Sequence, residues 1–421
     1  MNWKIPLSDI DFGPEEEEAV LRVLRSKWLT MGSETEAFEK EFAEHIGVRH
    51  AIAVSNGTAA LHLSMLALDI GPGDAVIQPA VNFVAAANMT KAVGATPVFT
   101  DIISMEEPTI SPDSIRDCLN ALSSPDAAKP KAIVVMHYGG YPCRMDEIKT
   151  ICDEHNLVLI EDACHGIGGA YNQKKLSKNG NQTNEEDTFP LLGSIGDAGC
   201  FSFFSNKNLA TGEGGMVSTN QDDIADKIRL LRSHGMTTLT WERYRGHAAT
   251  YDVSCHGYNY RSDEIRSAIG CEQLKKLAQN NDRRLELTAL YWKNLEPIID
   301  KGWALPFRSD FYSALNSDSQ LPKNHASDIP SCHLLSVVAP DPDIRWQCAE
   351  QLKKSGIQTS LHYPLIPDFS AFERNSHYSK IDIASDFCER VITLPLYPSL
   401  TKSDVSFVTE QLITAAQNIQ I

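Results

Sequence analysis

Short apolar runs alternate with amphipathic segments through the first part of the chain. The runs are four to six residues long, rich in β-branched residues and bounded by turn-forming residues, which is typical of strands. Seven such runs are present, at residues 51–55, 75–78, 96–100, 132–137, 158–161, 199–203 and 215–219. Helical patterns lie between many of them, at residues 58–68, 84–93, 113–122, 145–156 and 222–233.

Several of these runs are apolar at every position, as in Ile133-Val134-Val135-Met136. A strand that is apolar on both faces is typical of a parallel sheet covered by helices on both sides. We therefore predict an α/β fold, with a mostly parallel sheet in a three-layer large domain.

The pattern changes in the C-terminal part. A long charged helix is predicted at residues 263–295, and strands at 334–339 and 359–361 are separated by a helix at 344–354. Two later helices are expected at residues 383–392 and 403–416. This order predicts a smaller α+β domain over residues 256–421, after a large domain over residues 1–255. The N-terminal segment is a candidate to pack on the smaller domain.

Three stretches interrupt the alternation. Residues 174–192 are polar and predict a surface insertion without a core of its own. Residues 236–254 begin the connection to the second domain, and residues 307–330 predict a long exposed loop.

Composition narrows the classes of function. The formal net charge of −17 argues against a nucleic-acid or anionic-membrane surface, and no apolar run approaches the ~20 residues that span a bilayer. The chain starts without a secretory signal, so we expect a cytoplasmic protein. Its ten cysteines contain no C-x-x-C pair and are interpreted as buried thiols, neither disulfides nor metal ligands.

Three segments could carry chemistry at the carboxyl ends of strands, where open parallel sheets bind ligands. The first is Ser55-Asn56-Gly57-Thr58, which opens a helix and could bind a phosphate with its backbone N–H groups. By itself this segment is more often a simple N-cap than a phosphate site. The chain has neither a Walker A loop nor a G-x-G-x-x-G fingerprint, which disfavours a nicotinamide dehydrogenase.

The other two segments supply an acid and an amine. Asp162 follows a predicted strand and could pair with a cationic ligand atom, such as the pyridinium nitrogen of pyridoxal phosphate. Lys207 lies between an aromatic strand and a glycine-rich turn, where partial burial would favour a nucleophilic amine. Ser202 could add a hydroxyl to the phosphate site. If either residue stood alone, Asp162 would be interpreted as a helix N-cap or a surface acid, and Lys207 would be interpreted as a solvated surface lysine. His137, at the end of a predicted strand, is interpreted as structural.

Taken together, these segments resemble the DegT/DnrJ/EryC1/StrS family of pyridoxal-phosphate-dependent sugar aminotransferases. The similarity covers nearly the whole chain. It includes Ile5-Pro6-Leu7-Ser8, Trp28-Leu29-Thr30-Met31-Gly32, Val54–His62, Asn82–Asn88, His137-Tyr138-Gly139-Gly140, Ile160–His165, Gly196–Phe203, Lys207–Leu209 with Gly212–Gly215, Gly257-Tyr258-Asn259-Tyr260-Arg261 and His362-Tyr363-Pro364. The region 174–192 is longer than is usual in the family. Lysine at 207 separates the chain from relatives that carry histidine there and act as dehydratases.

The resemblance implies a role for each matching residue. Lys207 would bind pyridoxal 5′-phosphate as an imine and carry the catalytic proton, Asp162 would hold the ring nitrogen, and Phe83 would stack on the ring. Gly57, Thr58 and Ser202 would bind the phosphate, and His165 would lie near the cofactor. Asn259 would reach the phosphate of a second subunit, which implies a homodimer with shared active sites. Arg261 is a candidate for the carboxylate of the amino donor, and His362 and Tyr363 for the sugar.

The implied reaction transfers an amino group from an amino-acid donor, usually glutamate, to a keto sugar carried as a nucleotide conjugate. Two alternatives remain open on the same scaffold. One is an aminotransferase for a cyclitol or another non-nucleotide ketone, and the other is a non-catalytic, cofactor-binding regulator. The sugar, the nucleotide and the position of amination do not follow from the sequence.

Overall fold

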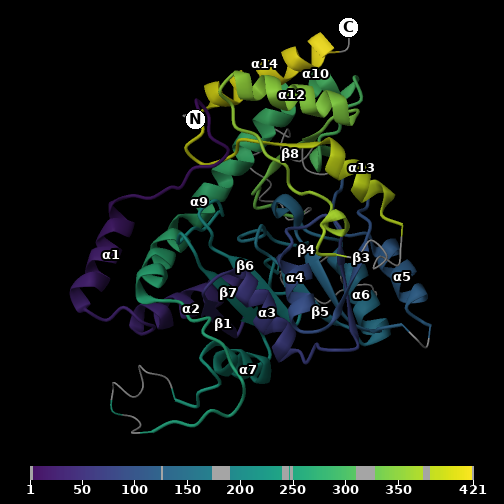
Figure 1. Ribbon diagram of the computed structural model, residues 1–421. Coiled ribbons are helices and arrows are strands. Elements are labelled where there is room, and N and C mark those ends of the chain that lie inside the picture. Colours follow the sequence, from purple (N-terminus) through teal and green to yellow (C-terminus); the bar gives the residue numbers. More distant parts are fainter. Residues whose placement is uncertain are drawn as a thin grey trace, which may run out of the picture.

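A seven-stranded sheet forms the centre of the large domain in the computed structural model, which describes residues 3–124, 127–172, 190–238, 246, 250–309, 328–372 and 380–419 (Figure 1). The strand order is β1-β7-β6-β5-β4-β2-β3. The strands are β1 His50–Val54, β2 Asp74–Pro79, β3 Thr96–Thr100, β4 Lys129–Met136, β5 Val158–Asp162, β6 Ala198–Ser202 and β7 Gly215–Thr219. Each of the seven predicted segments is therefore a strand.

Strand direction decides where a ligand can bind. Only β7 runs antiparallel to its neighbours β1 and β6, whereas β2, β3, β4, β5 and β6 pair in parallel. Because β7 lies between β1 and β6, β1 runs in the same direction as the parallel strands. The carboxyl ends of these six strands consequently share one edge of the sheet, the edge at which α/β proteins bind ligands.

Helices cover both faces of this sheet. In β4, Ala132 and Val134 pack into the cluster beneath α3, α4 and α7, while Ile133 and Val135 pack into the cluster beneath α5 and α6. All four side chains are completely buried, as the continuous apolar run predicted. These helices are α3 Gly57–Ala67, α4 Ala85–Ala92, α5 Pro112–Ala121, α6 Met145–His155 and α7 Asp222–Arg232. The prediction of a three-layer α/β domain is confirmed.

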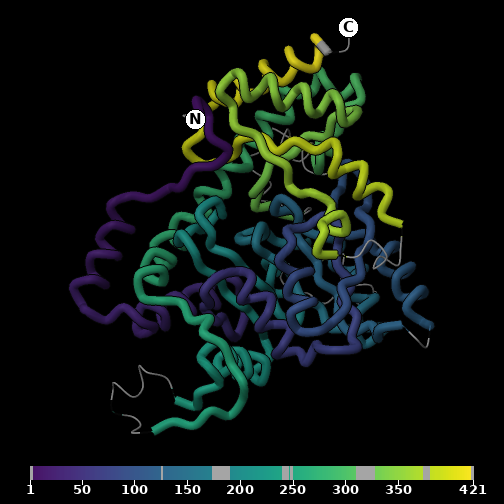
Figure 2. Tube along the Cα trace, viewed as in Figure 1, coloured from purple at the N-terminus to yellow at the C-terminus, as the bar shows by residue number. Residues whose placement is uncertain are grey.

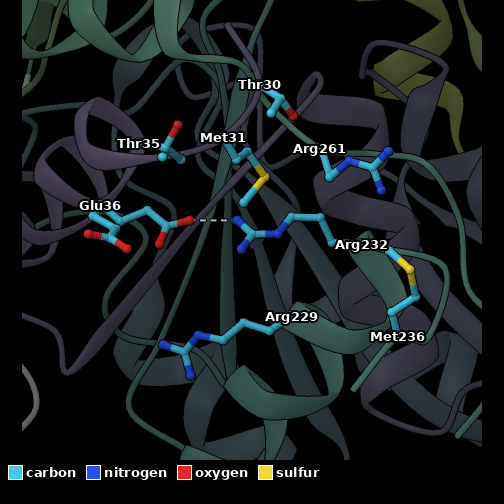
Figure 3. Close-up of a pocket in the computed structure, with 10 residues that line it drawn as sticks. Thr30, Met31, Thr35, Glu36, Arg229, Arg232, Met236 and Arg261 are labelled. Atoms are coloured by element: carbon cyan, nitrogen blue, oxygen red, sulfur yellow. Dashed lines mark hydrogen bonds and ion pairs between the residues drawn. The ribbon is translucent and has the colours of Figure 1, made fainter. Parts of the chain in front are cut away.

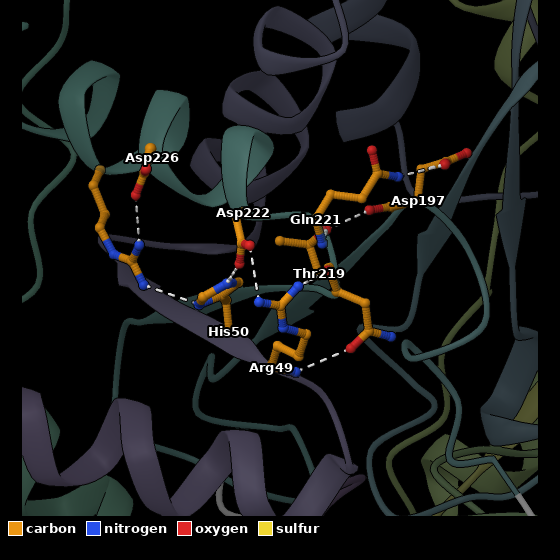
Figure 4. A network of polar contacts seen from close by, with 9 residues as sticks. Arg49, His50, Asp197, Thr219, Gln221, Asp222 and Asp226 are labelled. Carbon is orange, nitrogen blue, oxygen red and sulfur yellow. Dashed lines mark hydrogen bonds and ion pairs between the residues drawn. The ribbon is translucent and has the colours of Figure 1, made fainter.

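Charged side chains join the amino end of β1 to the N-terminus of α7 (Figure 4). Asp222, the first residue of α7, accepts hydrogen bonds from Arg49 at 2.8 Å and pairs with His50 at 2.6 Å. A carboxylate at a helix N-terminus is also favoured by the helix dipole. This network lies at the amino end of β1, opposite the edge that binds ligands.

Two N-terminal helices were not predicted: α1 Pro14–Ser26 and α2 Ser33–Ile46. In α1 only Glu16, Ala19 and Val23 are buried, because the helix lies on the outside of the molecule against α9 Glu264–Asn294 (Figure 1). Its apolar positions are confined to the second half of the helix, because Glu15–Glu18 occupy the first turn, so the amphipathic pattern is short.

The C-terminal part contains a two-stranded antiparallel sheet of β8 Leu335–Val338 and β9 Val391–Leu394. The predicted strand at 359–361 is wrong, because Ser360 makes only an isolated bridge to Thr393. The predicted helix at 383–392 ends at Arg390, and its last two residues belong to β9. The remaining elements are α10 Glu296–Ile299, α12 Pro342–Lys354, α13 Asp382–Arg390, α14 Lys402–Ile419 and the short 3₁₀ helices Tyr138–Gly140 and Ile366–Asp368.

The N-terminal segment lies beside the C-terminal part, as the trace shows (Figure 2). Ile5 forms a parallel bridge with Ile357, and the N–H of Leu396 donates to the carbonyl oxygen of Leu7 at 3.2 Å. Side chains of the large domain, such as Tyr138, and of the C-terminal part, such as Phe387, belong to one apolar cluster. The division of the chain at residue 255 stays a prediction.

The three interrupting stretches lie partly outside the described residues, which omit 173–189, 239–245, 247–249 and 310–327. Within the described parts, Leu192 and Phe307 are buried, so the ends of the predicted surface insertion and exposed loop belong to the core. The Phe307 ring stacks on Tyr141, with centroids 3.9 Å apart. All ten cysteines are free thiols and eight are buried, as predicted. No helix in the described ranges is long and apolar enough to cross a membrane.

Candidate active site

A cavity of about 450 Å³ opens at the carboxyl ends of β4, β5 and β6 and at the start of α3. Nine of the eleven predicted site residues line it. The full lining is Asn56, Gly57, Thr58, Leu61, Asn82, Phe83, Ala85, Met136, Asp162, Cys164, His165, Ser202, Phe204, Asn206, Lys207, Glu213, His362 and Tyr363. The cavity is therefore formed by several short segments that lie far apart in the sequence, the first at Asn56 and the last at Tyr363.

The first turn of α3 forms one wall. The Asn56 side chain caps the helix by accepting the N–H of Ala59 at 2.8 Å. The N–H groups of Gly57 and Thr58 lie in this first turn, where a helix provides no acceptor of its own. A Cβ atom on Gly57 would lie 2.9 Å from Cβ of Ser202, so only glycine brings the helix this close to β6. The N-cap and the phosphate interpretations of this segment are thus compatible.

Asp162 is the last residue of β5, and its side chain is buried while lining the cavity. One carboxylate oxygen accepts the N–H of Cys164 at 3.2 Å, and the other lies 3.5 Å from Nδ2 of Asn82. No helix begins at this position, which excludes the N-cap interpretation, and its burial excludes a surface acid. A buried carboxylate of this kind is placed to pair with a cationic ligand atom.

Lys207 lies on the loop 203–214, which joins β6 to β7. Both ends of the loop are fixed, because Ser202 and Gly215 pair across the two strands and the N–H of Phe203 donates to Gly214 at 2.8 Å. Burial lowers the pKa of the Lys207 amine, and the nearby Cys164 and Asp162 only partly oppose that shift. A lowered pKa increases the fraction of neutral amine, which is the form that attacks a carbonyl.

Phe83 is exposed although it lines the cavity. Its side chain is 55% accessible, and its ring centroid lies 5.9 Å from that of Tyr363. Phe204 lines the same cavity and is 45% accessible. Large apolar side chains exposed inside a cavity are suited to cover the ring of a bound ligand.

His165 is buried in the wall of the cavity, and its two ring nitrogens differ in their hydrogen bonds. Its Nε2 lies 2.9 Å from the hydroxyl of Tyr363, whereas its buried Nδ1 has no partner among the described residues. Burial, followed by the charge of Lys207, holds the pKa of His165 well below its usual value. Burial likewise lowers the pKa of His362 to about 4, and His362 Nδ1 lies 2.9 Å from Oγ1 of Thr393. Both imidazoles are therefore neutral near neutral pH.

Glu161 was not among the predicted site residues. Its buried carboxylate accepts the N–H groups of Gly193, Ile195 and Gly196 at 2.9, 2.7 and 2.6 Å. It also pairs at 3.0 Å with Nε2 of His137, whose Nδ1 accepts the N–H of Cys143. Because Glu161 and Asp162 are adjacent in β5, Glu161 points to the opposite face of the sheet, where it fixes the segment leading into β6.

Other cavity residues were also missed, namely Asn82, Asn206 and Glu213. Asn82 contacts Asp162, and Oδ1 of Asn206 is buried without a partner in the described part of the chain. The position of Asn206 beside Lys207 was the only signal in the sequence that could have indicated it.

Asn259 and Arg261 do not line this cavity. Asn259 forms an antiparallel bridge with Ser233, and Arg261 lines a separate hollow of about 180 Å³. Figure 3 shows that hollow, with Arg229, Arg232 and Arg261 near Met31 and Met236. Burial and the nearby Arg232 lower the pKa of Arg261. The predicted contacts of these two residues with cofactor and donor stay predictions.

The sequence profile of the DegT/DnrJ/EryC1/StrS aminotransferase family matches residues 11–413. The chain belongs to this family. The spore coat polysaccharide biosynthesis protein SpsC of Bacillus subtilis is 36% identical over 414 residues, covering 97% of this chain and 96% of SpsC.

Solved structures of aminotransferases have the same fold. The aminotransferase TlmJ from Streptoalloteichus hindustanus superposes with a TM-score of 0.82 at 29% identity, over 99% of both chains. PseC of Helicobacter pylori, an aminotransferase of pseudoaminic acid biosynthesis, gives a TM-score of 0.78 at 25% identity, over 98% of this chain and 99% of PseC.

The protein is thus a sugar aminotransferase by family, and its cofactor is pyridoxal 5′-phosphate, on which the DegT/DnrJ/EryC1/StrS aminotransferases depend. The residues present fit that cofactor. The cavity offers a helix N-terminus for a phosphate, a buried carboxylate in Asp162, an amine of lowered pKa in Lys207 and an exposed ring in Phe83.

Proposed function

We propose that this aminotransferase moves an amino group from glutamate to a keto sugar carried as a nucleotide conjugate. The observation that carries the proposal is that Lys207, Asp162 and the first turn of α3 line one cavity. SpsC is named for spore coat polysaccharide biosynthesis and PseC for the biosynthesis of pseudoaminic acid, and the first of these supports a sugar acceptor.

Each residue has a role in that proposal. The N–H groups of Gly57 and Thr58, with the Ser202 hydroxyl, bind the cofactor's phosphate at the positive end of the α3 dipole. Asp162 keeps a proton on the ring nitrogen, Phe83 covers the ring, and Lys207 provides the covalent attachment. When bound, the cofactor supplies an electron sink for bond cleavage at the amino-bearing carbon. Nζ of Lys207, once released, carries the proton to and from that carbon.

His165, His362 and Tyr363 line the same cavity, and the Tyr363 ring lies near that of Phe83. Neutral imidazoles beside Lys207 add no positive charge that would compete with its proton transfers. His362 and Tyr363 are the residues we assign to the sugar.

The proposal includes a homodimer in which Asn259 reaches the cofactor phosphate, and Arg261 the donor carboxylate, of the neighbouring subunit. Exposed apolar side chains on and around α1 support a protein–protein contact: Ile10, Phe12, Leu21, Leu24 and Leu29 are each more than a third exposed. The mass of the protein in solution tests this part, and a monomer at working concentration would contradict it.

Absorbance spectroscopy tests the function. The purified protein with pyridoxal phosphate should show the visible band of a lysine-bound cofactor, and glutamate should convert it to the amine form. Lys207→Ala should lose the lysine-bound band, whereas Lys149→Ala, at an exposed position of α6, should retain it. A wild-type protein that binds no cofactor would refute the proposal.

The acceptor is identified with the glutamate-loaded enzyme. A panel of nucleotide-linked keto sugars, free keto sugars and cyclitol ketones should restore the lysine-bound band, fastest with the nucleotide conjugates. If only cyclitol ketones restore the band, the acceptor is a cyclitol and not a nucleotide-linked sugar. If no amino acid changes the spectrum, the protein is a regulator.

A further inference from the structure

Behind the cavity, two amide side chains have their orientations fixed by backbone carbonyl groups. Asn281 of α9 donates from Nδ2 to the carbonyl oxygen of Ile167 at 3.0 Å. Asn208, the residue after Lys207, donates from Nδ2 to the carbonyl oxygen of Ser331 and to Oδ1 of Asn281, both at 2.8 Å. Because a carbonyl oxygen can only accept, neither amide can be turned around without losing these bonds.

This orientation determines where the proton of His333 lies. Oδ1 of Asn208 is 3.0 Å from Nδ1 of His333 and can only accept, so Nδ1 of His333 carries a hydrogen. Burial lowers the pKa of His333 well below its usual value, and the facing groups His165, Lys207, Arg284 and His362 lower it further. His333 is therefore a neutral imidazole, with its lone pair on Nε2.

His333 in turn contacts His165. The two rings lie with centroids 4.3 Å apart and an interplanar angle of 42°. The segment that carries His333 also holds the backbone of His165, because Oγ of Ser331 donates to the carbonyl oxygen of His165 at 2.6 Å. His165 thus receives support from its ring face and from its backbone, and both supports lead to Asn208.

We propose that His333 is a positioning residue for His165, held in its Nδ1–H form by Asn208. In this arrangement His165 keeps its Nε2 directed at the Tyr363 hydroxyl, and its Nδ1 stays available to a molecule bound in the cavity. Asn208 joins this support directly to the backbone of Lys207, so the amine and the imidazole are placed by one side chain. The inference rests on the proposed function for its catalytic meaning, although the tautomer itself does not depend on it.

Nitrogen-15 NMR of histidine-labelled protein tests the tautomer without any activity measurement. In the cofactor-free wild-type protein, His333 should give the pattern of a neutral ring protonated on Nδ1 at neutral pH. The His333 signal is identified by its loss in His333→Gln. An imidazolium, or a neutral ring protonated on Nε2, would overturn the proposal whether or not the protein is an aminotransferase.

Three variants test the positioning role. Asn208→Asp places a carboxylate beside Nδ1, and His333 should become protonated at neutral pH. His333→Phe keeps a ring against His165 but donates no hydrogen bond, so we expect about tenfold weaker cofactor binding and a shifted His165 signal. His333→Gln can still donate to Asn208 and should lose less than His333→Phe.

The control is His155→Phe, at the exposed C-terminal end of α6. It should match the wild type in every measurement. A His333→Phe protein with a wild-type His165 signal and wild-type cofactor affinity would overturn the positioning role. If His333→Phe does not fold, the wild-type tautomer and the His333→Gln protein decide the question.

Discussion

The Tyr363 hydroxyl oxygen lies 2.9 Å from Nε2 of His165, and both side chains line the cavity that contains Lys207. Tyr363 comes from the C-terminal part of the chain and His165 from the turn after β5. This contact closes one side of the cavity with a residue that lies far from the lysine in sequence.

Tyr363→Phe removes the partner of a buried ring nitrogen. An unsatisfied buried polar atom costs about 1–3 kcal/mol, so we expect a lower free energy of unfolding and roughly tenfold slower transamination. Chemical denaturation and steady-state kinetics measure the two effects. Wild-type turnover in Tyr363→Phe would show that the hydrogen bond has no part in catalysis.

Asp162→Asn keeps the shape of the side chain and removes its charge. We expect the cofactor still to attach to Lys207, with turnover lower by about a hundredfold or more, because a charge placed against the reacting ring is lost. Single-turnover absorbance with glutamate measures the step. Asp153→Asn, at an exposed position of α6, should behave as wild type, and an active Asp162→Asn enzyme would contradict the assignment.

Gly57→Ala adds a methyl group 2.9 Å from Cβ of Ser202 and 3.1 Å from Sγ of Cys164. The first turn of α3 must move away from β6, so the phosphate site should open and the dissociation constant of pyridoxal phosphate should rise about tenfold or more. Fluorescence titration measures that constant. Gly71→Ala, where the nearest atom would lie 3.9 Å away, is the control and should leave it unchanged.

The lowered pKa of Lys207 predicts two dependences on pH. The rate at which the cofactor-free protein captures pyridoxal phosphate should rise with pH through a pKa below the ordinary lysine value of 10.5. Between that pKa and 10.5 the unfolded chain binds more protons than the folded one, so this group makes stability increase with pH in that window. Stopped-flow absorbance and thermal unfolding at several pH values measure both. A capture rate that follows an unshifted lysine would contradict the lowered pKa.

Glu264→Gln tests how α2 is attached to α9. The Glu264 carboxylate accepts the N–H groups of Gly32, Glu34 and Thr35 at 2.8–2.9 Å, and the Thr35 hydroxyl at 2.7 Å. Glutamine has only one accepting oxygen and places an NH₂ group against N–H donors, so we expect a loss of roughly 2–3 kcal/mol in the free energy of unfolding. Glu410→Gln, on the exposed face of α14, should lose almost none.

Much of the sheet could be predicted because its strands are buried on both faces. The run Ile133–Met136 can only be placed where both sides are covered, and that condition fixes the layer architecture. Helices α1 and α2 lacked this signal, because their exposed faces carry most of their residues. The predicted helix at 383–392 includes the first two residues of β9, because Val391 and Ile392 continue the apolar spacing of α13, and only pairing with β8 decides between helix and strand.

The cavity could be predicted where a residue ends a strand, as Asp162 does, or begins the helix that follows one, as Gly57 does. Glu161 and His333 could not, because their roles depend on segments distant in sequence: the turn before β6 for one, and the side chain of Asn208 for the other. A glutamate beside an aspartate gives no indication of which carboxylate faces the ligand until the strand's orientation is known.

The loop that carries Lys207 begins and ends on paired residues of adjacent antiparallel strands. Leu209 and Ala210 of this loop are buried in the core, whereas exchanging the Lys207 side chain alone leaves the hydrogen-bonded ladder on either side intact. The reactive amine can therefore be replaced without altering the pairing of β6 with β7, so lineages of this scaffold can change their chemistry at that position while they keep the sheet and the anion site.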